Sequence, residues 1–273
     1  MVAWTRPAAS YRGGVDSLTL PRSVLLALWL AEPSPGSGPV QRLLDAVQGE
    51  DEPHRVSTTD DGDTPASLAD LVAVWASGPR TVAAVLPAPG DPAGAPASVA
   101  GAAQEAGEAV LVSTVDGDWA AVPRVQSFGS VYEPGYLVTW QVSRVPAWQN
   151  ALVGQVGTLR EAERELTGAL SRATEALTSL DVARWREDAA EQIAALSAGA
   201  DPRWSLPPGM DQRRVRVLTQ AARLRAIVDL ATGDDGAAVN LWQVDQRSTA
   251  LRDVDRAARR ALAVATHPAP PVR

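Results

Sequence analysis

The sequence predicts an α+β protein in two parts: an N-terminal antiparallel sheet with flanking helices, followed by an all-α, four-helix, coiled-coil-like bundle. Three observations support this fold class. Short apolar runs separated by turn residues continue as far as Val145, which is typical of strands. From Gln149 the apolar residues recur in steps of three and four, as in helices that pack along a seam. The charge also changes, since residues 1–150 carry 16 acids and 8 arginines, whereas residues 151–273 carry 16 and 17.

The composition excludes several kinds of chemistry. All 25 basic residues are arginine, and the chain has no cysteine and two histidines. The lack of lysine excludes a P-loop lysine and a Schiff base, and the lack of cysteine excludes thiolate nucleophiles and zinc fingers. His54 and His267 lie in proline-flanked, irregular segments, so a histidine-based relay or metal site is not expected. The absence of cysteine fits a reducing compartment, and we expect a cytoplasmic protein.

The first part is expected to place its helices on one side of the sheet. The apolar run 20–31 is too short to span a bilayer, so we interpret it as a buried helix. The acidic, turn-rich segment 49–64 is interpreted as a mobile surface loop. Further helices are expected at 40–47, 68–76 and 97–106, the second of them capped by Ser67. Strands are expected at 81–86, 109–115, 119–125 and 136–145, with Pro123 indicating an edge strand.

The second part is expected to contain four helices in up-down-up-down order. No proline falls between Gly154 and Asp181, so one helix is expected to run without a break from 149 to 180. The other helices are expected at 182–196, 217–231 and 237–265. The predicted domains are therefore 1–146, acidic and α+β, and 147–267, helical, with a flexible tail at 268–273. Because its seams need no help from the first part, the fragment 147–273 is expected to fold alone.

Two acids interrupt the helical seams. Glu163 and Asp255 occupy positions where the pattern calls for an apolar residue. In an up-down-up-down bundle both lie at a similar height, with Arg223 and Arg225 at a compatible height on the third helix. One interpretation is an arginine-neutralised layer that fixes helix register. The other is a pocket for a ligand between the bundle and the first part.

A second group of residues is expected to contact partners or the other domain. Trp119, Trp148 and Trp204 are tryptophans that the apolar pattern does not bury. Arg252, Arg256 and Arg259 share one helical face, which could meet phosphates. Pairing with acids on the first two helices is the favoured alternative for these arginines.

The function that we predict is non-catalytic: an interaction or assembly protein whose helical domain mediates self-association or partner binding. The alternatives are a small-molecule-binding protein or carboxylate-dependent hydrolase with a pocket between the domains, and nucleic-acid binding through the arginines. We expect a protein partner or a homo-oligomer, no membrane association, and no cofactor or metal.

Overall fold

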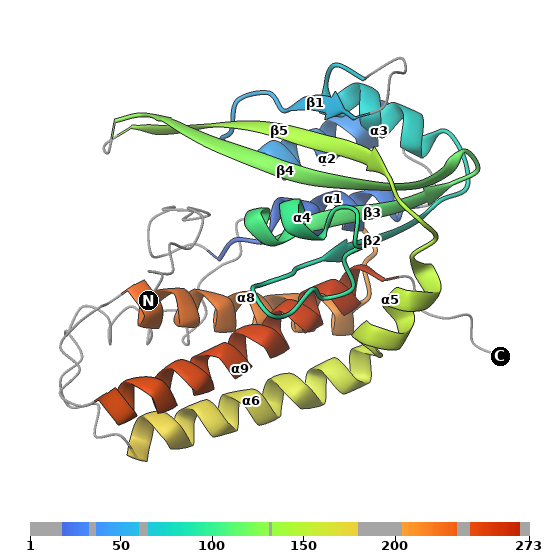
Figure 1. The fold of residues 1–273 in the computed structure, drawn as a ribbon. Coiled ribbons are helices and arrows are strands. Elements are labelled where there is room, and N and C mark those ends of the chain that lie inside the picture. Colours follow the sequence, from blue (N-terminus) through green and yellow to red (C-terminus); the bar gives the residue numbers. More distant parts are fainter. Residues whose placement is uncertain are drawn as a thin grey trace.

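The computed structural model describes residues 18–32, 37–59, 65–130, 133–179, 204–233 and 241–267. Its centre is a five-stranded sheet in the order β1-β5-β4-β3-β2 (Figure 1). The strands, in chain order, are β1 Arg55–Thr58, β2 Thr81–Val85, β3 Ala109–Thr114, β4 Gly117–Gly129 and β5 Pro134–Arg144. Strands β2 to β5 form antiparallel pairs, whereas β1 pairs with β5 in parallel.

The prediction of an antiparallel sheet is therefore wrong in one respect, because the sheet is mixed. The parallel strand β1 lies in segment 49–64, which the composition had indicated to be a mobile loop. Residues on both sides of β1 are hydrogen-bonded to β5: Glu52 N donates to Tyr136 O at 3.1 Å, and Thr59 N donates to Val142 O at 3.2 Å. A four-residue strand with one buried side chain, Val56, has too little apolar pattern to be recognised locally.

Four helices accompany the sheet. They are α1 Arg22–Leu30, α2 Ser37–Gln48, α3 Leu68–Ala76 and α4 Ala100–Ala106. Every residue of α1 is buried, and the helix packs against β2 and β3. As expected, Ser67 caps α3: its hydroxyl accepts from Asp70 N, and the Asp70 carboxylate accepts from Ser67 N.

The long helix expected at 149–180 is two helices, α5 Gln149–Val156 and α6 Leu159–Ser179. Gly157 separates them with φ 77° and ψ −156°, a conformation open mainly to glycine. Thr158 then begins α6 with a capping box, since Glu161 Oε2 accepts from Thr158 N at 2.8 Å. The prediction failed because proline is only one of the signals that end a helix.

Helices α8 Gln212–Gly233 and α9 Leu241–Thr266 complete the described helical part. α9 packs along both α6 and α8 (Figure 1). The contacts of Arg214 with His267 and of Arg225 with Asp255 show that α8 and α9 are antiparallel. The helix expected at 182–196 and the tail at 268–273 lie outside the described residues, so the expected four-helix bundle remains a prediction.

The helical part packs directly on the sheet. α9 contacts β2 and α1, and the buried residues of both parts form one continuous hydrophobic cluster. At the end of α9, Thr266 Oγ1 accepts from Ala84 N at 2.8 Å, so a helix covers the outer edge of β2. No helix in the described ranges is long and apolar enough to cross a membrane.

Candidate functional site

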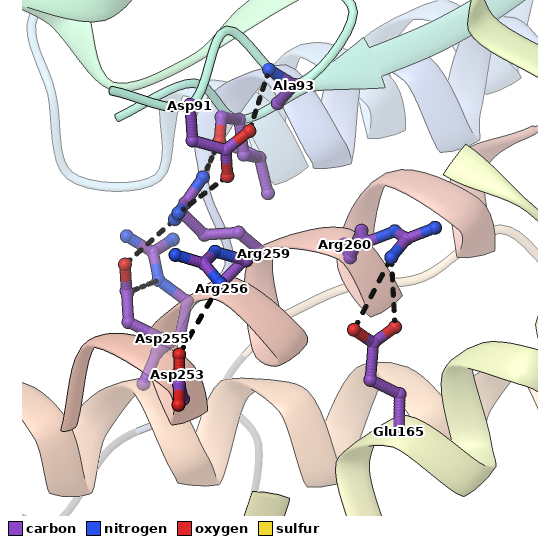
Figure 2. A network of polar contacts seen from close by, with 10 residues as sticks. Asp91, Ala93, Glu165, Asp253, Asp255, Arg256, Arg259 and Arg260 are labelled. Atoms are coloured by element: carbon purple, nitrogen blue, oxygen red, sulfur yellow. Dashed lines mark hydrogen bonds and ion pairs between the residues drawn. The ribbon is translucent and has the colours of Figure 1, made fainter. Parts of the chain in front are cut away.

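A polar network lies where α9 meets the N-terminal part, and Arg259 is at its centre (Figure 2). The side chain of Arg259 is only 7% exposed. Its Nη1 donates to Leu86 O at 2.6 Å, its Nη2 to Asp91 Oδ2 at 3.0 Å and its Nε to Asp255 Oδ2 at 2.8 Å. One guanidinium thus satisfies a carboxylate of its own helix, and a carboxylate and a buried carbonyl in the segment that follows β2.

The loop after β2 is shaped to present Asp91 to Arg259. The backbone groups of Ala88 and Asp91 bond each other reciprocally at 2.8 Å, which closes a tight turn. Asp91 Oδ1 accepts from Ala93 N at 3.2 Å, so the second oxygen of the carboxylate is also held. Gly94 lets the loop approach α5, since a Cβ there would lie 2.6 Å from Leu152 Cδ1.

Arg260, the next residue of α9, reaches toward α5 and α6 instead. Its Nη2 donates to Gln155 O at 3.0 Å, and its Nη1 lies 3.4 Å from Glu165 Oε2 (Figure 2). Because successive helical side chains point about 100° apart, two adjacent arginines tie α9 to the N-terminal part and to the preceding helices at one level.

The structure places Glu163 and Asp255 in two separate ion pairs. Glu163 on α6 binds Arg213 near the start of α8, through Nε at 2.9 Å and through Nη2. Asp255 binds Arg259, and its Oδ1 lies 3.7 Å from Arg225 Nε. Arg213 and Arg225 are twelve residues apart on α8, about 18 Å along the helix axis. The two carboxylates therefore do not share one layer.

The break at Gly157 explains where Glu163 lies. The buried stripe of α6 is Ala162, Leu166 and Ala169, whereas Leu170 is 41% exposed. Glu163 flanks this stripe and is partly exposed. The hydrogen bond from Arg213 lowers the pKa of the Glu163 carboxyl, so the pair is ionised at neutral pH.

Arg223 and Arg225 take different places on α8. Arg225 is the arginine that approaches Asp255. Three buried atoms, Arg223 Nε, Arg225 Nε and Asp255 Oδ1, have no hydrogen-bond partner among the described residues. The expected group of four is therefore split, with Asp255 and Arg225 together and Glu163 elsewhere.

The expected partner-contact residues are mostly used inside the molecule. Trp148 is buried, Trp204 packs against the core, and the Arg144 guanidinium lies 4.4 Å above the ring of Trp119. Arg259 is buried, so interpreting it as a partner contact is wrong. Arg256 is exposed beside Asp253, and Arg252 is exposed. The three arginines therefore do not form a continuous exposed stripe.

A second buried network, missed at the sequence level, joins α1, β5 and the segment before β1. Asp51 Oδ2 accepts from Arg22 Nε at 2.7 Å and lies 3.1 Å from His54 Nε2. Trp140 Nε1 donates to His54 Nδ1 at 3.1 Å. Since an indole N–H can only donate, His54 Nδ1 is unprotonated and Nε2 carries the proton that Asp51 accepts.

The Asp51 carboxyl is held ionised by these partners. Burial raises its pKa, but the hydrogen bonds from His54 and Arg22 outweigh burial and lower the pKa below its usual value. Both ring nitrogens of His54 are engaged and the residue is buried, so the network positions segments rather than presenting a reactive group. The helpful signal was Trp140, a tryptophan on a buried face that needs an acceptor.

Neither network has the composition of a metal site. In the part of the chain that the structure describes, no three histidine, aspartate or glutamate side chains gather as ligands. Each carboxylate at the junction is instead neutralised by arginine. The arrangement can hold the two parts of the fold in register.

The fold is thus that of a two-part α+β protein with an N-terminal sheet region and a C-terminal helical region. Two family models match the chain in the same order. The first, Rv1486c-like protein, N-terminal domain, matches residues 23–156, and the second, Rv1486c-like protein, C-terminal domain, matches residues 160–263. The chain is therefore similar to Rv1486c-like proteins in both of its parts. No curated protein and no solved structure matches it.

Proposed function

We propose that this protein is a non-catalytic interaction or assembly protein that binds a polypeptide partner through the outer part of the β4–β5 hairpin. We call residues 124–129 of β4 and 134–137 of β5 the hairpin arm. The arm reaches past the other strands (Figure 1). The observation that carries the proposal is that the arm leaves Phe128 45% and Leu137 40% exposed. Exposed apolar side chains that gather on one element are typical of protein-binding surfaces.

The helical domain supports a different role from the one expected from its seams. The apolar residues of α9 from Ala257 to Ala265 are buried, and α9 contacts α6, α8, β2 and α1. This surface is used for packing within the molecule. The proposed binding surface is therefore the arm rather than the helices.

The alternative functions have less support. The carboxylates expected to line a pocket, Glu163 and Asp255, each bind an arginine of the same chain. Direct hydrogen bonds cross the junction where a ligand was expected, through Arg259 and Thr266. Nucleic-acid binding has the burial of Arg259 against it, because a buried guanidinium does not reach a phosphate.

Site-specific photo-cross-linking tests the proposal. A benzoylphenylalanine placed at Leu137 is expected to give a discrete cross-linked polypeptide product in cells that contain the protein. The matched control is the same probe at Val153 on α5, which is 58% exposed but lies outside the arm. The proposal fails if Leu137 gives no discrete product, or if Val153 gives the same products.

A further inference from the structure

Along the arm, the outer edge of β4 has no strand partner among the described residues. The register of β3 with β4 runs from Thr114↔Gly117 to Val110↔Ala121, whereas β4 and β5 remain paired as far as Gly129↔Pro134. Among the described residues, therefore, no strand pairs with β4 on this side beyond Ala121. Backbone N–H and C=O groups on such an edge can pair with another strand.

The other two sheet edges are covered. Thr266 at the end of α9 accepts from Ala84 N on β2. On the opposite side, Val56 N of β1 donates to Ala66 O at 3.3 Å, and Arg55 bridges with Ser67. Proteins commonly cover their edges in this way to prevent unwanted association. The outer edge of β4 is covered in part, since α4 contacts β4 and Pro123 is buried, but Gln126 to Gly129 are exposed. The outer half of this edge thus differs from both of the others.

The direction of each β4 backbone group follows from the alternation in antiparallel pairs. Ala84 N points away from β3, so the backbone N–H and C=O of its partner Val110 point away from β2 and toward β4. There they bond the backbone of Ala121. Odd-numbered residues of β4 therefore face the β3 side, and even-numbered residues face β5. Two carbonyls of β5 support this assignment. Tyr136 O and Val142 O accept from residues beside β1 and so point away from β4, and both residues lie opposite odd-numbered residues of β4.

The unpaired edge therefore presents the backbone of Val125, Ser127 and Gly129, whereas Pro123 is buried. Each of these three residues has a backbone donor and a backbone acceptor. On the face that carries Phe128, the ring lies over Gly135, since a Cβ there would be 2.3 Å from Phe128 Cζ. Leu137 pairs with Gln126 on the same face.

From this edge we infer that the arm's partner is a second copy of the chain, whose β4 pairs antiparallel with the first about a two-fold axis at Gln126. This inference rests on the proposed function and names its partner. In this register Val125 bonds Ser127 of the other copy in both directions, and the two-fold axis repeats this pair on its other side.

The charges and aromatic groups of the arm fit the same register. Arg124 of one copy lies across from Phe128 of the other, where a cation–π contact is favourable. Antiparallel pairing also brings the Arg124 end of one arm beside the Glu133 end of the other. Both side chains are exposed, and neither is in an ion pair with another described residue. A parallel arrangement would instead bring like charges together.

A single introduced cysteine tests the register, because the chain has none of its own. Gln126 faces its own copy across the axis in a non-hydrogen-bonded pair, where Cα atoms are about 4.5 Å apart and a disulfide can form. Mild oxidation of full-length Gln126→Cys is expected to give a covalent dimer at least about tenfold faster than that of Val153→Cys. Equal rates, or no dimer from Gln126→Cys, overturn the inference.

Sedimentation of the full chain tests the backbone pairing. The wild type is expected to dimerise between about 1 and 200 µM, since an edge contact of this length is at the small end of stable interfaces. Ser127→Pro removes an outward N–H and is expected to weaken the dimer at least about tenfold, whereas Ser127→Ala keeps it. Equal dimerisation of the two variants, or a wild type that stays monomeric, overturns the inference.

Two readouts keep the outcomes distinct. If circular dichroism shows that Ser127→Pro is unfolded, the rate at which Gln126→Cys forms a covalent dimer alone decides whether the arms pair. If the Leu137 probe cross-links only to a different polypeptide, the self-pairing fails while the proposed interaction function stands. If the probe cross-links to nothing, both fail.

Discussion

Replacing Arg259 by methionine is expected to weaken the contact between the helical and sheet parts more than any other single arginine change at the junction. Methionine keeps the buried aliphatic stem but removes the guanidinium, which leaves Asp91, Asp255 and the Leu86 carbonyl without their donor. Leu86 is fully buried, so its carbonyl gains little from water in the variant.

The magnitude follows from the exposure of the groups left behind. Removing one partner of a buried ion pair costs about 3–5 kcal/mol. The side chains of Asp255 and Asp91 retain 17% and 31% exposure, and Asp255 keeps Arg225 at 3.7 Å. Water therefore compensates in part, and we expect a loss of about 3 kcal/mol. For a chain of this size this corresponds to a fall in Tm of about 6–12 °C.

Calorimetry and circular dichroism at pH 7 measure the effect. The matched control is Arg256→Met on the same helix, whose exposed pair with Asp253 is expected to contribute less than about 0.5 kcal/mol. Adding Asp91→Asn to Arg259→Met removes the carboxylate that is left without an arginine and is expected to restore part of the stability. If Arg259→Met melts within the range of the Arg256→Met control, the network does not hold the junction and the reasoning is refuted.

Three further predictions concern other parts of the fold. Gly157→Ala is expected to destabilise the protein by about 1–3 kcal/mol, because the backbone conformation of this residue is strained for any side chain. Gly154→Ala lies inside α5, where an added Cβ has no atom within 4 Å, and is expected to stabilise the protein. Thermal melts in which Gly157→Ala is the more stable variant contradict the break between α5 and α6. Asp51 has a lowered pKa, so its contribution is present above the unfolded-state pKa of about 4 and is lost as the pH falls through the folded value. Urea titrations from pH 6 to 3 are expected to show a flatter profile for Asp51→Asn than for wild type; parallel profiles contradict it. The fragment 147–273, expected from its seams to fold alone, is now expected to be helical without a cooperative melt, because α9 loses β2 and α1; a sharp calorimetric transition contradicts it.

The elements that local pattern predicts well are those whose signals lie within the element itself. Helix α3 with its Ser67–Asp70 capping box, and strands β2 and β3 with their compact apolar runs, are found within a residue or so of their expected bounds. Strand β1 is different, because its partner β5 begins some eighty residues later and supplies the reason for it to be a strand. Its own four residues carry little of the information.

The positions of Glu163 and Arg259 show two other limits. The pattern at 149–180 is continuous because the apolar stripes of α5 and α6 join smoothly in sequence, and the Thr158–Glu161 capping signal was present but overlooked. In the sequence, nothing distinguishes Arg259 from the other arginines of the same helix. Its partners, Leu86 and Asp91, lie 173 and 168 residues away, a separation at which sequence periodicity carries no information.

The two-part organisation of the sequence and the continuity of the core describe different properties. The family models meet between residues 156 and 160, where α5 ends and Gly157 turns the chain into α6. Yet Arg259, Arg260 and Thr266 bond across this division, and the hydrophobic cluster runs through it. Since an unpaired buried charge is costly, the parts gain their full stability only when packed together. The packing that joins them uses the apolar face of α9, which is why we propose the arm, and not the helices, as the surface that binds a partner.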